Sequence, residues 1–334
     1  MSANKNRKLV LAEIPKGKLG HEHFVLQESD VPKPAEGEAL VKVRYISIDA
    51  SNRAWMQGTT YRAAVKAGDV MAGYVLGEVV ESRDPKLKKG DLVFGDCGWQ
   101  EVAVRPAKEL NKLPSLEPIT HLLSVYGITG LTAYFGLTEI GVPKPEETLV
   151  VSAAAGAVGS VAGQIGKIKG CRVVGIAGSD EKGAWLTKEL GFDATINYKK
   201  EKVHEALRKT CPEGIDIYFD NVGGDILEAA LFQTNTYGRI ICCGMISGYD
   251  GEFSAKGPSG IPGLLVIKRI TMRGFIVSDH LKDYGRAVKE LAGWVAGGRI
   301  KVREDIVEGL ENTPQALIGL LHGENLGKRM VKVS

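Results

Sequence analysis

A short run of small residues near the middle of the chain is the first pattern that could do chemistry. It reads AAGAVG over residues 154–159 and follows a continuous apolar stretch over residues 148–152. A dinucleotide-binding fold needs such a turn, because the backbone must approach a pyrophosphate whose charge sits at the N-terminus of the next helix. Gly156 permits that approach and Gly159 lets the helix pack near the strand, whereas Ala154 replaces the first glycine of the usual G-x-G-x-x-G pattern.

The same small residues would also suit tight helix packing, and their setting distinguishes the two interpretations. An apolar strand precedes the turn, a helical pattern continues to Lys169, and a second strand begins near Cys171. This order of strand, turn, helix and strand indicates a βαβ unit with a nucleotide site.

The end of the second predicted strand bears on which dinucleotide would bind. NAD sites place an Asp or Glu there, which accepts hydrogen bonds from the ribose hydroxyls and would repel a 2′-phosphate. Here Gly178 and Ser179 follow the strand, no acid stands at its tip, and Lys182 lies within reach of a phosphate. The two acids after Ser179 could simply begin the next helix, and Lys182 could be only a solvated helix residue. The pattern favours NADPH.

Two patterns of hydrophobic and turn residues along the sequence indicate the elements that would position this turn. Residues 1–123 hold short runs rich in Val, Ile and aromatics between Pro- and Gly-containing turns, which is typical of a barrel-like β domain. From residue 148, strands alternate with helices, which predicts βαβ units and a doubly wound parallel sheet. No further βαβ unit follows residue 301, so the end of the chain is expected to rejoin the first domain. The predicted strands are 9–13, 24–28, 39–47, 74–81, 148–152, 172–177, 194–197, 215–220, 238–243, 271–277 and 330–333, and the predicted helices after the turn are 181–190, 203–210, 226–232, 282–296 and 314–321.

Bulk composition excludes several classes of protein. The chain has 334 residues, of which 44% are hydrophobic and 25% charged, as in a globular protein of two domains. The net charge of +3 comes from interleaved acids and bases and gives no reason to expect nucleic acid as a partner. No apolar stretch reaches the roughly 20 residues that span a bilayer, so no membrane partner is expected. Five cysteines without C-x2-C spacing argue against disulfides and structural zinc and fit a reducing cytoplasm.

Seven stretches spread over most of the chain carry a resemblance to a known family. They are GITGLTAY at 127–134, SAAAGAVG at 152–159, GSDEK at 178–182, NYK at 197–199, YFDNVGG at 218–224, CGMISGY at 243–249 and NLGK at 325–328. With them the chain resembles the zinc-free leukotriene B4 dehydrogenase/prostaglandin reductase branch of the medium-chain dehydrogenases/reductases. That branch includes plant double-bond reductases and bacterial curcumin-reductase-like enzymes.

The resemblance implies an α/β protein with a GroES-like β domain and a doubly wound Rossmann domain. The expected divisions are a GroES-like domain at residues 1–123, a Rossmann domain at 124–298 and a C-terminal return to the first domain at 299–334. It further implies NADPH in the cleft between the domains and reduction of the C=C bond of α,β-unsaturated aldehydes or ketones. A homodimer with Rossmann sheets joined edge to edge is a further expectation from the family.

The resemblance also implies roles for individual residues. Lys182 and Tyr198 match the family's contacts with the 2′-phosphate, in agreement with the charge argument above, and Tyr249 matches a tyrosine proposed to bind the substrate carbonyl. The other matching cofactor positions are Thr129, Gly156, Ala157, Val158, Gly178, Ser179, Asn221, Cys243, Gly244, Ile246, Ser247, Phe275, Ile276, Val277, Asn325 and Gly327. Thr129 could instead serve only helix packing, and Cys243 could be only a core residue.

Two departures concern the substrate pocket and the metal. The family often carries DPYMR where this chain has DASNR at residues 49–53, so an aromatic that would shape the pocket is missing. Zinc-dependent relatives carry Cys and Gly-His-Glu ligands, whereas this chain has no Cys near Asp49 and no His at Tyr74. A four-cysteine structural lobe is also absent from the sequence, so no metal is expected.

Without a Lewis acid, polarising the substrate would fall to hydrogen bonds. In an enone, hydride from the nicotinamide adds to the β-carbon and negative charge grows on the carbonyl oxygen, so a donor placed at that oxygen lowers the barrier. Tyr249 is the candidate donor, although it could be a loop aromatic that lines the cleft without donating. The proton for the α-carbon could come from Tyr249 or from solvent.

Three functions fit these residues. The first is an NADPH-dependent alkenal or enone reductase, the second a quinone or carbonyl reductase on the same scaffold, and the third a non-catalytic NADPH-binding sensor. The Gly- and Pro-rich residues 251–263 are a candidate lid over the cleft.

Overall fold

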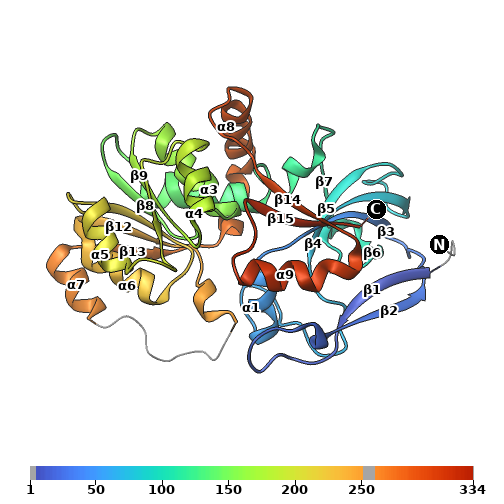
Figure 1. The fold of residues 1–334 in the computed structure, drawn as a ribbon. Helices are drawn as coiled ribbons and strands as arrows, with labels where there is room; N and C mark the ends of the chain where they lie inside the picture. Colours follow the sequence, from blue (N-terminus) through green and yellow to red (C-terminus); the bar gives the residue numbers. More distant parts are fainter. Residues whose placement is uncertain (1–4, 251–259, 334) are drawn as a thin grey trace.

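Two separate sheets organise the computed structural model, which describes residues 5–250 and 260–333 (Figure 1). One sheet belongs to a β-rich body built from both ends of the chain, and the other to an α/β body built from its middle. The candidate lid at 251–263 lies outside the described residues except for its last part, which begins helix α7 (Ile261–Lys268). No helix among the described residues is long and apolar enough to cross a membrane.

The β-rich body holds a seven-stranded sheet in the order β14-β15-β3-β4-β5-β7, with β6 also paired to β3. A separate antiparallel pair, β1 and β2, lies beside it (Figure 1). Helices α1 and α9 complete this body. The bounds are β1 (Lys5–Leu11), β2 (Phe24–Asp30), β3 (Glu38–Ser47), α1 (Ser51–Gln57), β4 (Tyr74–Ser82), β5 (Leu92–Asp96), β6 (Val102–Pro106), β7 (Asn111–Lys112), β14 (Glu304–Glu308), α9 (Thr313–Leu321) and β15 (Lys328–Lys332).

The end of the chain is part of this first body. Strand β15 pairs antiparallel with β3, with Met330 opposite Ser47, and β14 pairs parallel with β15. The core confirms the connection, because Leu317 of α9 and Val331 of β15 pack in one cluster with the buried Trp55. Strands β14 and β15 and helix α9 therefore share a sheet and a core with segments from the first part of the chain.

The α/β body holds a six-stranded, all-parallel sheet in the order β10-β9-β8-β11-β12-β13. Numbered along this body, the order is 3-2-1-4-5-6, which is the doubly wound order of dinucleotide-binding domains. The strands are β8 (Thr148–Val151), β9 (Arg172–Ala177), β10 (Ala194–Asn197), β11 (Ile215–Asp220), β12 (Thr234–Cys242) and β13 (Thr271–Gly274).

Helices cover both faces of this sheet, because its strands are apolar on both sides. Leu149 and Val151 point to one face and Val150 to the other, and each face has its own buried cluster. The first cluster includes residues of α2 (Ile128–Phe135), the following π-helical turn (Gly136–Gly141), α3 (Ala157–Ile168), α4 (Asp180–Lys188) and α8 (Tyr284–Ala296); the second includes residues of α5 (Val203–Thr210), α6 (Gly224–Gln233) and α7. The predicted doubly wound class is confirmed.

Several predicted element boundaries are wrong, for identifiable reasons. Strand β13 was expected to run to residue 277 but ends at Gly274, because its only partner, β12, ends at the paired Cys242. Strand β1 begins at Lys5, before the predicted residue 9, because its pairing with β2 extends to a Lys5–Asp30 ion pair of 2.7 Å. Polar strand ends of this kind resemble a loop when read from sequence.

Candidate functional site

The small-residue turn joins β8 to α3 through a sharp reversal of the backbone. Ala153 has φ +46°, and the amide of Gly156 donates to the carbonyl oxygen of Ala153 at 2.9 Å. Gly156 is the N-cap of α3 and offers no side-chain cap, so the first amides of the helix face outward without a protein acceptor in the cap. A Cβ on Gly159 would lie 2.4 Å from the Ala153 oxygen, so glycine is required there for the helix to pack this closely.

The turn lies where the order of the sheet reverses, between the adjacent strands β8 and β11. The carboxyl ends of these two strands are tied together by Asn221. Its side-chain amide donates to the carbonyl oxygen of Ser152 at 2.7 Å, and its backbone amide donates to the Ser152 hydroxyl at 2.9 Å. In doubly wound sheets this crevice is where ligands bind.

Asp220, which the sequence analysis did not single out, organises the loop after β11. Its side chain is 2% exposed, and its Oδ1 accepts from the Tyr218 hydroxyl at 2.9 Å and from the amides of Val222 and Gly223 at 3.1 and 3.0 Å. Burial raises the pKa of Asp220, and the two loop amides oppose that rise. The sequence signal was an acid ending an apolar strand directly before NVGG.

The backbone of Asp220 connects a second loop to the first. Its carbonyl oxygen accepts from the amides of Cys243 and Gly244, at 2.9 and 3.1 Å. The Ser247 hydroxyl donates to the carbonyl oxygen of Val222 at 2.6 Å, and the Ile246 amide donates to that of Asn221 at 3.2 Å. The predicted residues after β11 and after β12 thus form one hydrogen-bonded unit.

Tyr249 follows the short 3-10 helix Ile246–Gly248 and is half-buried. Its hydroxyl oxygen accepts from the backbone amide of Met245 at 3.2 Å. Within the part of the chain that the structure describes, no acceptor takes the Tyr249 proton, so the O–H is free to donate to a ligand. Burial raises the pKa of Tyr249, and the Met245 amide opposes that rise.

The turn after β9 carries the predicted cation. Ser179 is the N-cap of α4, and its hydroxyl accepts from the Lys182 amide at 3.2 Å. The Lys182 ammonium donates to the carbonyl oxygen of Gly323 at 2.7 Å, so it reaches across to the end of the chain. Burial lowers the pKa of Lys182, and the charges of Lys199 and Arg329 lower it further. Three cationic side chains therefore share one region.

Gly178 lies beneath two side chains from the loop after β10. A Cβ at this position would meet the Tyr198 ring at 3.2 Å and the Lys199 side chain at 3.3 Å. Tyr198 was predicted from the resemblance, whereas Lys199 was missed, because a lysine beside Lys200 reads as a solvated run. A cavity of about 180 Å³ adjoins this turn on the side of Ser179, Gly183 and Asn197.

The chain end also reaches the small-residue turn. The amide of Gly327 donates to the carbonyl oxygen of Ala155 at 2.8 Å, and Gly327 forms an isolated parallel bridge with Gly156. The buried Asn325 donates from its side-chain amide to the Gly327 oxygen at 2.9 Å. Gly327 has φ +73°, and a Cβ there would lie 2.1 Å from the Arg303 oxygen, so glycine is needed for this close crossing. Ala157 and Val158, in the first turn of α3, follow directly after this bridge.

The remaining predicted residues lie after β12, after β13 and on α2. Phe275 and Val277 pack against the core just after β13, whereas Ile276 is exposed. Thr129 is buried and donates its hydroxyl to the Ser124 carbonyl oxygen at 3.1 Å. Burial raises the pKa of Cys243 to about 12, which leaves its thiol a weak nucleophile.

The residues around Asp49 do not fit a zinc site. The Asp49 carboxylate is bonded at both oxygens, by the Lys328 ammonium at 2.6 Å and by the Ser47 hydroxyl at 2.5 Å. Lys328 is buried and also donates to the Ile48 carbonyl oxygen at 3.0 Å. Across residues 5–250 and 260–333, no group of three or more His, Cys, Asp or Glu side chains could hold a metal ion.

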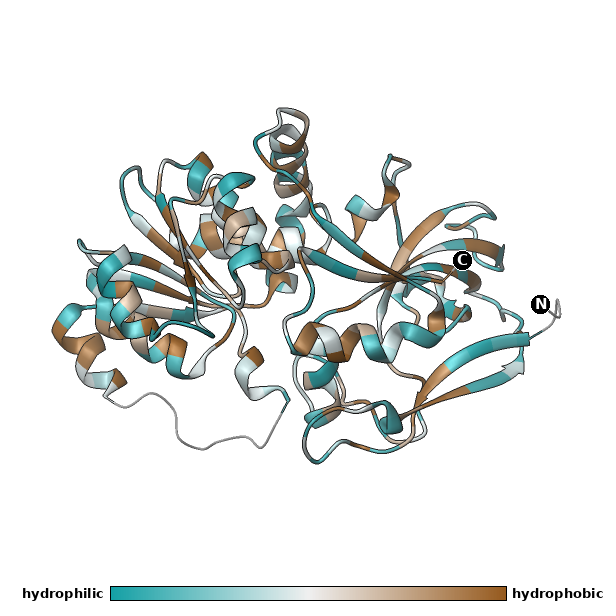
Figure 2. Ribbon diagram, in the orientation of Figure 1, coloured by the Kyte–Doolittle hydropathy of each residue, from teal (hydrophilic) through white to brown (hydrophobic). Residues whose placement is uncertain are grey.

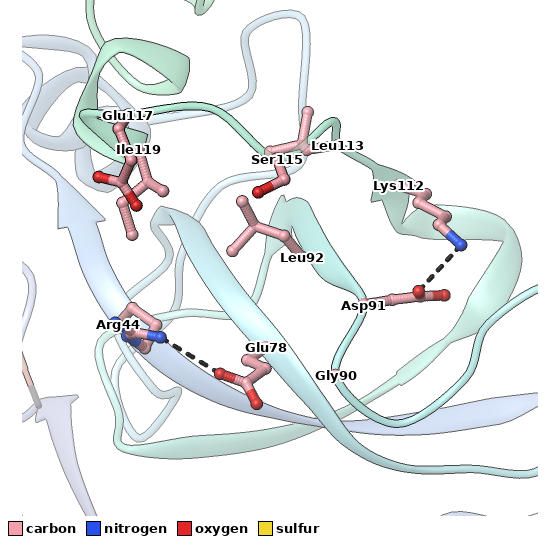
Figure 3. Close-up of a pocket in the computed structure, with 10 residues that line it drawn as sticks. All are labelled: Arg44, Glu78, Gly90, Asp91, Leu92, Lys112, Leu113, Ser115, Glu117 and Ile119. Carbon is pink, nitrogen blue, oxygen red and sulfur yellow. Dashed lines mark hydrogen bonds and ion pairs between the residues drawn. The ribbon is translucent and has the colours of Figure 1, made fainter.

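A cavity of about 390 Å³ lies elsewhere, on strands β3, β4 and β5 of the β-rich body (Figure 3). Four of its charged side chains form ion pairs, Arg44 with Glu78 at 3.2 Å and Lys112 with Asp91 at 2.9 Å, and Glu117 also lines it. None of the residues discussed above lines it, so this cavity is separate from the crevice at the sheet edge.

Comparison with known proteins covers nearly the whole chain. One matching family model is described as the N-terminal domain of oxidoreductase, over residues 7–113, and another as zinc-binding dehydrogenase, over residues 157–293. The chain is 43% identical to the NADPH-dependent curcumin reductase of Escherichia coli, over 99% of this chain and 97% of that protein. It is 42% identical to prostaglandin reductase 1 of Bos taurus, over 92% and 93% of the two chains.

Two further similarities are of the same strength. The chain is 42% identical to the NADP(+)-dependent 2-alkenal reductase of Nicotiana tabacum, over 89% of this chain and 88% of that protein. The crystal structure of CurA from Vibrio vulnificus in complex with NADPH matches with a TM-score of 0.93 at 42% identity, over 98% of this chain and 99% of that chain.

The buried carboxylate of Asp220 predicts a pH-dependent stability. Since burial raises its pKa above the ordinary 3.8, the folded protein holds this proton more tightly than the unfolded chain does. The contribution of Asp220 to stability is therefore complete below its unfolded pKa and is lost as the pH rises through its folded pKa. Urea unfolding of the wild type and of Asp220→Asn across this range should show the difference in unfolding free energy, wild type minus variant, falling with increasing pH. A difference that grows with pH would mean that the hydrogen-bond donors lower the pKa of Asp220 more than burial raises it.

Proposed function

Because this chain belongs to the zinc-free leukotriene B4 dehydrogenase/prostaglandin reductase/curcumin reductase-like branch of the medium-chain dehydrogenases/reductases, we propose that it is an NADP-dependent oxidoreductase that reduces the C=C bond of α,β-unsaturated aldehydes and ketones. The observation that carries the proposal is Tyr249. Its half-buried hydroxyl, for whose proton the described residues offer no acceptor, lies on a segment that contacts both the crevice and the β-rich body. Relatives over the full length are named as reductases of curcumin, prostaglandins and 2-alkenals.

The residues at the sheet edge fit NADPH. Outward-facing amides of α3 suit a pyrophosphate, and the cations Lys182 and Lys199 suit a 2′-phosphate on the adenosine side, whereas Arg329 is already paired with Asp305 at 2.8 Å. Tyr198 would stack over Gly178, where a larger residue would collide with it. The remaining positions that would line the cofactor are Thr129, Gly156, Ala157, Val158, Ser179, Asn221, Cys243, Gly244, Ile246, Ser247, Phe275, Ile276, Val277, Asn325 and Gly327.

The proposed domains follow from which sheet each segment joins. Residues 1–123 and 299–334 would form the GroES-like domain, whose sheet contains both, and residues 124–298 would form the Rossmann domain. The proposed location is a reducing cytoplasm, in keeping with five cysteines that are all free thiols.

The chemistry needs a donor at the substrate carbonyl. Bound NADPH supplies the hydride that the β-carbon accepts. The Tyr249 hydroxyl would donate to the carbonyl oxygen, where negative charge grows in the transition state, and its raised pKa keeps the proton in place at neutral pH. The Met245 amide donates to the hydroxyl oxygen, so the hydroxyl proton would remain available for the substrate. The small-molecule substrate would lie between Tyr249 and the β-rich domain.

We propose a homodimer formed through the outer edge of the six-stranded sheet. Strand β13 is an edge strand, and neighbouring α7 exposes 75% of Val266 and 70% of Ile267. Apolar residues lie along α7 at the outer end of the molecule (Figure 2). Unpaired strand edges and exposed apolar patches are features that a second copy can cover.

Replacing the cation should change cofactor preference. Lys182→Ala is expected to raise KM for NADPH about 10- to 100-fold, because a charge-assisted hydrogen bond to the 2′-phosphate is lost. KM for NADH, which lacks that phosphate, should stay nearly constant. Steady-state kinetics with both cofactors measures this, with Lys188→Ala, exposed on the same helix, as the matched control. An equal loss with NADPH and NADH would contradict the assignment.

Replacing the donor should slow the reaction itself. Tyr249→Phe removes only the hydroxyl and is expected to cost about 2–4 kcal/mol in kcat/KM for alkenals and aryl enones, as for one oxyanion donor. NADPH consumption is followed with alkenals, aryl enones and quinones, with and without a chelator. Turnover of quinones but not of enones by the wild type would contradict the proposed function, and an unchanged kcat/KM in the variant would remove Tyr249 from the mechanism.

Disrupting the apolar edge should yield monomers. Val266→Asp places a charge in the proposed interface and is expected to halve the molar mass measured by light scattering. Val25→Asp, at an exposed apolar position on β2 of the other domain, is the control and should remain a dimer. A wild-type protein that is monomeric at micromolar concentration would refute the proposed interface.

A further inference from the structure

Helix α1 belongs to the β-rich body but contacts the segment that carries Tyr249. The side-chain amide of Gln57 donates to the backbone carbonyl oxygen of Tyr249 at 2.9 Å. One turn earlier, Arg53 forms an ion pair with Asp250, with Nε 3.3 Å from Oδ1. Figure 1 shows α1 beside the short helical turn that ends at this segment. These two contacts, Arg53–Asp250 and Gln57–Tyr249, are called the α1 clamp here.

The ion pair of the α1 clamp is buried and anchored on both sides. The Arg53 side chain is 1% exposed, and its Nη2 donates to the Gly17 carbonyl oxygen at 2.7 Å. The Asp250 carboxylate also accepts from the Leu19 amide at 2.7 Å. A buried charge that loses its partner is costly. The pair therefore holds the loop of residues 17–19, helix α1 and Asp250 in one arrangement.

The Tyr249 segment needs this external support. Within the α/β body, Tyr249 follows a three-residue 3-10 helix, an element with poor hydrogen-bond geometry. Among the residues that the structure describes, its hydroxyl is hydrogen-bonded to the Met245 amide alone, four residues away on the same turn. A displacement of about 1 Å in a donor can cost two orders of magnitude in rate. The contacts that fix the Tyr249 backbone against the β-rich body come from α1.

We propose that Gln57 and Arg53 are positioning residues, which set the Tyr249 hydroxyl for the reduction through the α1 clamp. This inference rests on the proposed donor role of Tyr249. It adds that the catalytic donor of one domain is aligned by a helix of the other. Neither Gln57 nor Arg53 contacts the predicted cofactor positions through the hydrogen bonds described, so cofactor affinity should not depend on them.

The test is a double-mutant cycle between Gln57 and Tyr249. Gln57 is exposed, so Gln57→Ala should leave the fold intact. It is expected to lower kcat for an enone roughly three- to tenfold, the range for one neutral hydrogen bond, with KM for NADPH unchanged. In a Tyr249→Phe background the same substitution should have almost no effect, because the group it aligns is gone. Thr59→Ala, an exposed position two residues beyond, is the control and should leave kcat unchanged.

A second variant tests the buried half of the clamp. Asp250→Asn keeps an oxygen for the Leu19 amide but removes the charge that faces Arg53. It should lower kcat in the otherwise wild-type protein but not in Tyr249→Phe. Full kcat in Gln57→Ala, or equal losses in both backgrounds, would overturn the α1 clamp while leaving the donor role intact. Normal turnover by Tyr249→Phe alone would instead refute the donor role and the clamp together.

Discussion

The buried carboxylate of Asp220 is the constraint on which the geometry of the site depends. A carboxylate removed from water is costly unless donors surround it, and this one is met by the hydroxyls of Tyr218 and Ser152 and by two amides of the loop that follows. The donors come from the same strand, from the residue after the neighbouring β8 and from the loop itself, so satisfying the carboxylate fixes where the loop can lie. Residues 243–249 then hydrogen-bond to that loop and to the backbone of Asp220. The hydrogen bonds that begin at Asp220, in a central strand of the sheet, therefore fix the segment of residues 243–249 that ends at Tyr249.

The parts of the fold that could be predicted from sequence are those encoded locally. Each βαβ unit carries its own apolar strand, turn and amphipathic helix, and alternation such as that of Leu149 and Val150 makes both faces of the sheet apolar. The pairing of β15 with β3 is different, because Met330 meets Ser47 from the opposite end of the chain. No local pattern specifies that partner. The sequence indicated only that the last segment adds no βαβ unit, and the edge strand β14 was missed altogether.

The residues of the candidate site likewise fall into those that a local sequence pattern predicts and those that it does not. The glycine-containing turn and Lys182 could be predicted because spacing after a strand is a local signal. Lys199, Arg53 and Gln57 could not, since each acquires its surroundings from a segment distant in sequence. Asp220 is an intermediate case, in which a local pattern existed but its burial depends on the sheet around it.

The absence of metal-ligand residues around Asp49 changes what the rest of the structure must provide. A metal ion brings a large fixed charge to a carbonyl oxygen, so its effect tolerates some misplacement, whereas a neutral O–H is directional and loses its effect quickly with angle and distance. An enzyme that relies on Tyr249 must therefore hold the tyrosine hydroxyl in position with additional contacts. That requirement accounts for the contacts that residues 245–250 receive from Asn221 and Val222, in the loop after β11, and from α1 of the β-rich body. In the proposed mechanism this arrangement has a consequence: residues 245–250 are held by contacts from both bodies, so the Tyr249 hydroxyl would be in place only when α1 lies against this segment.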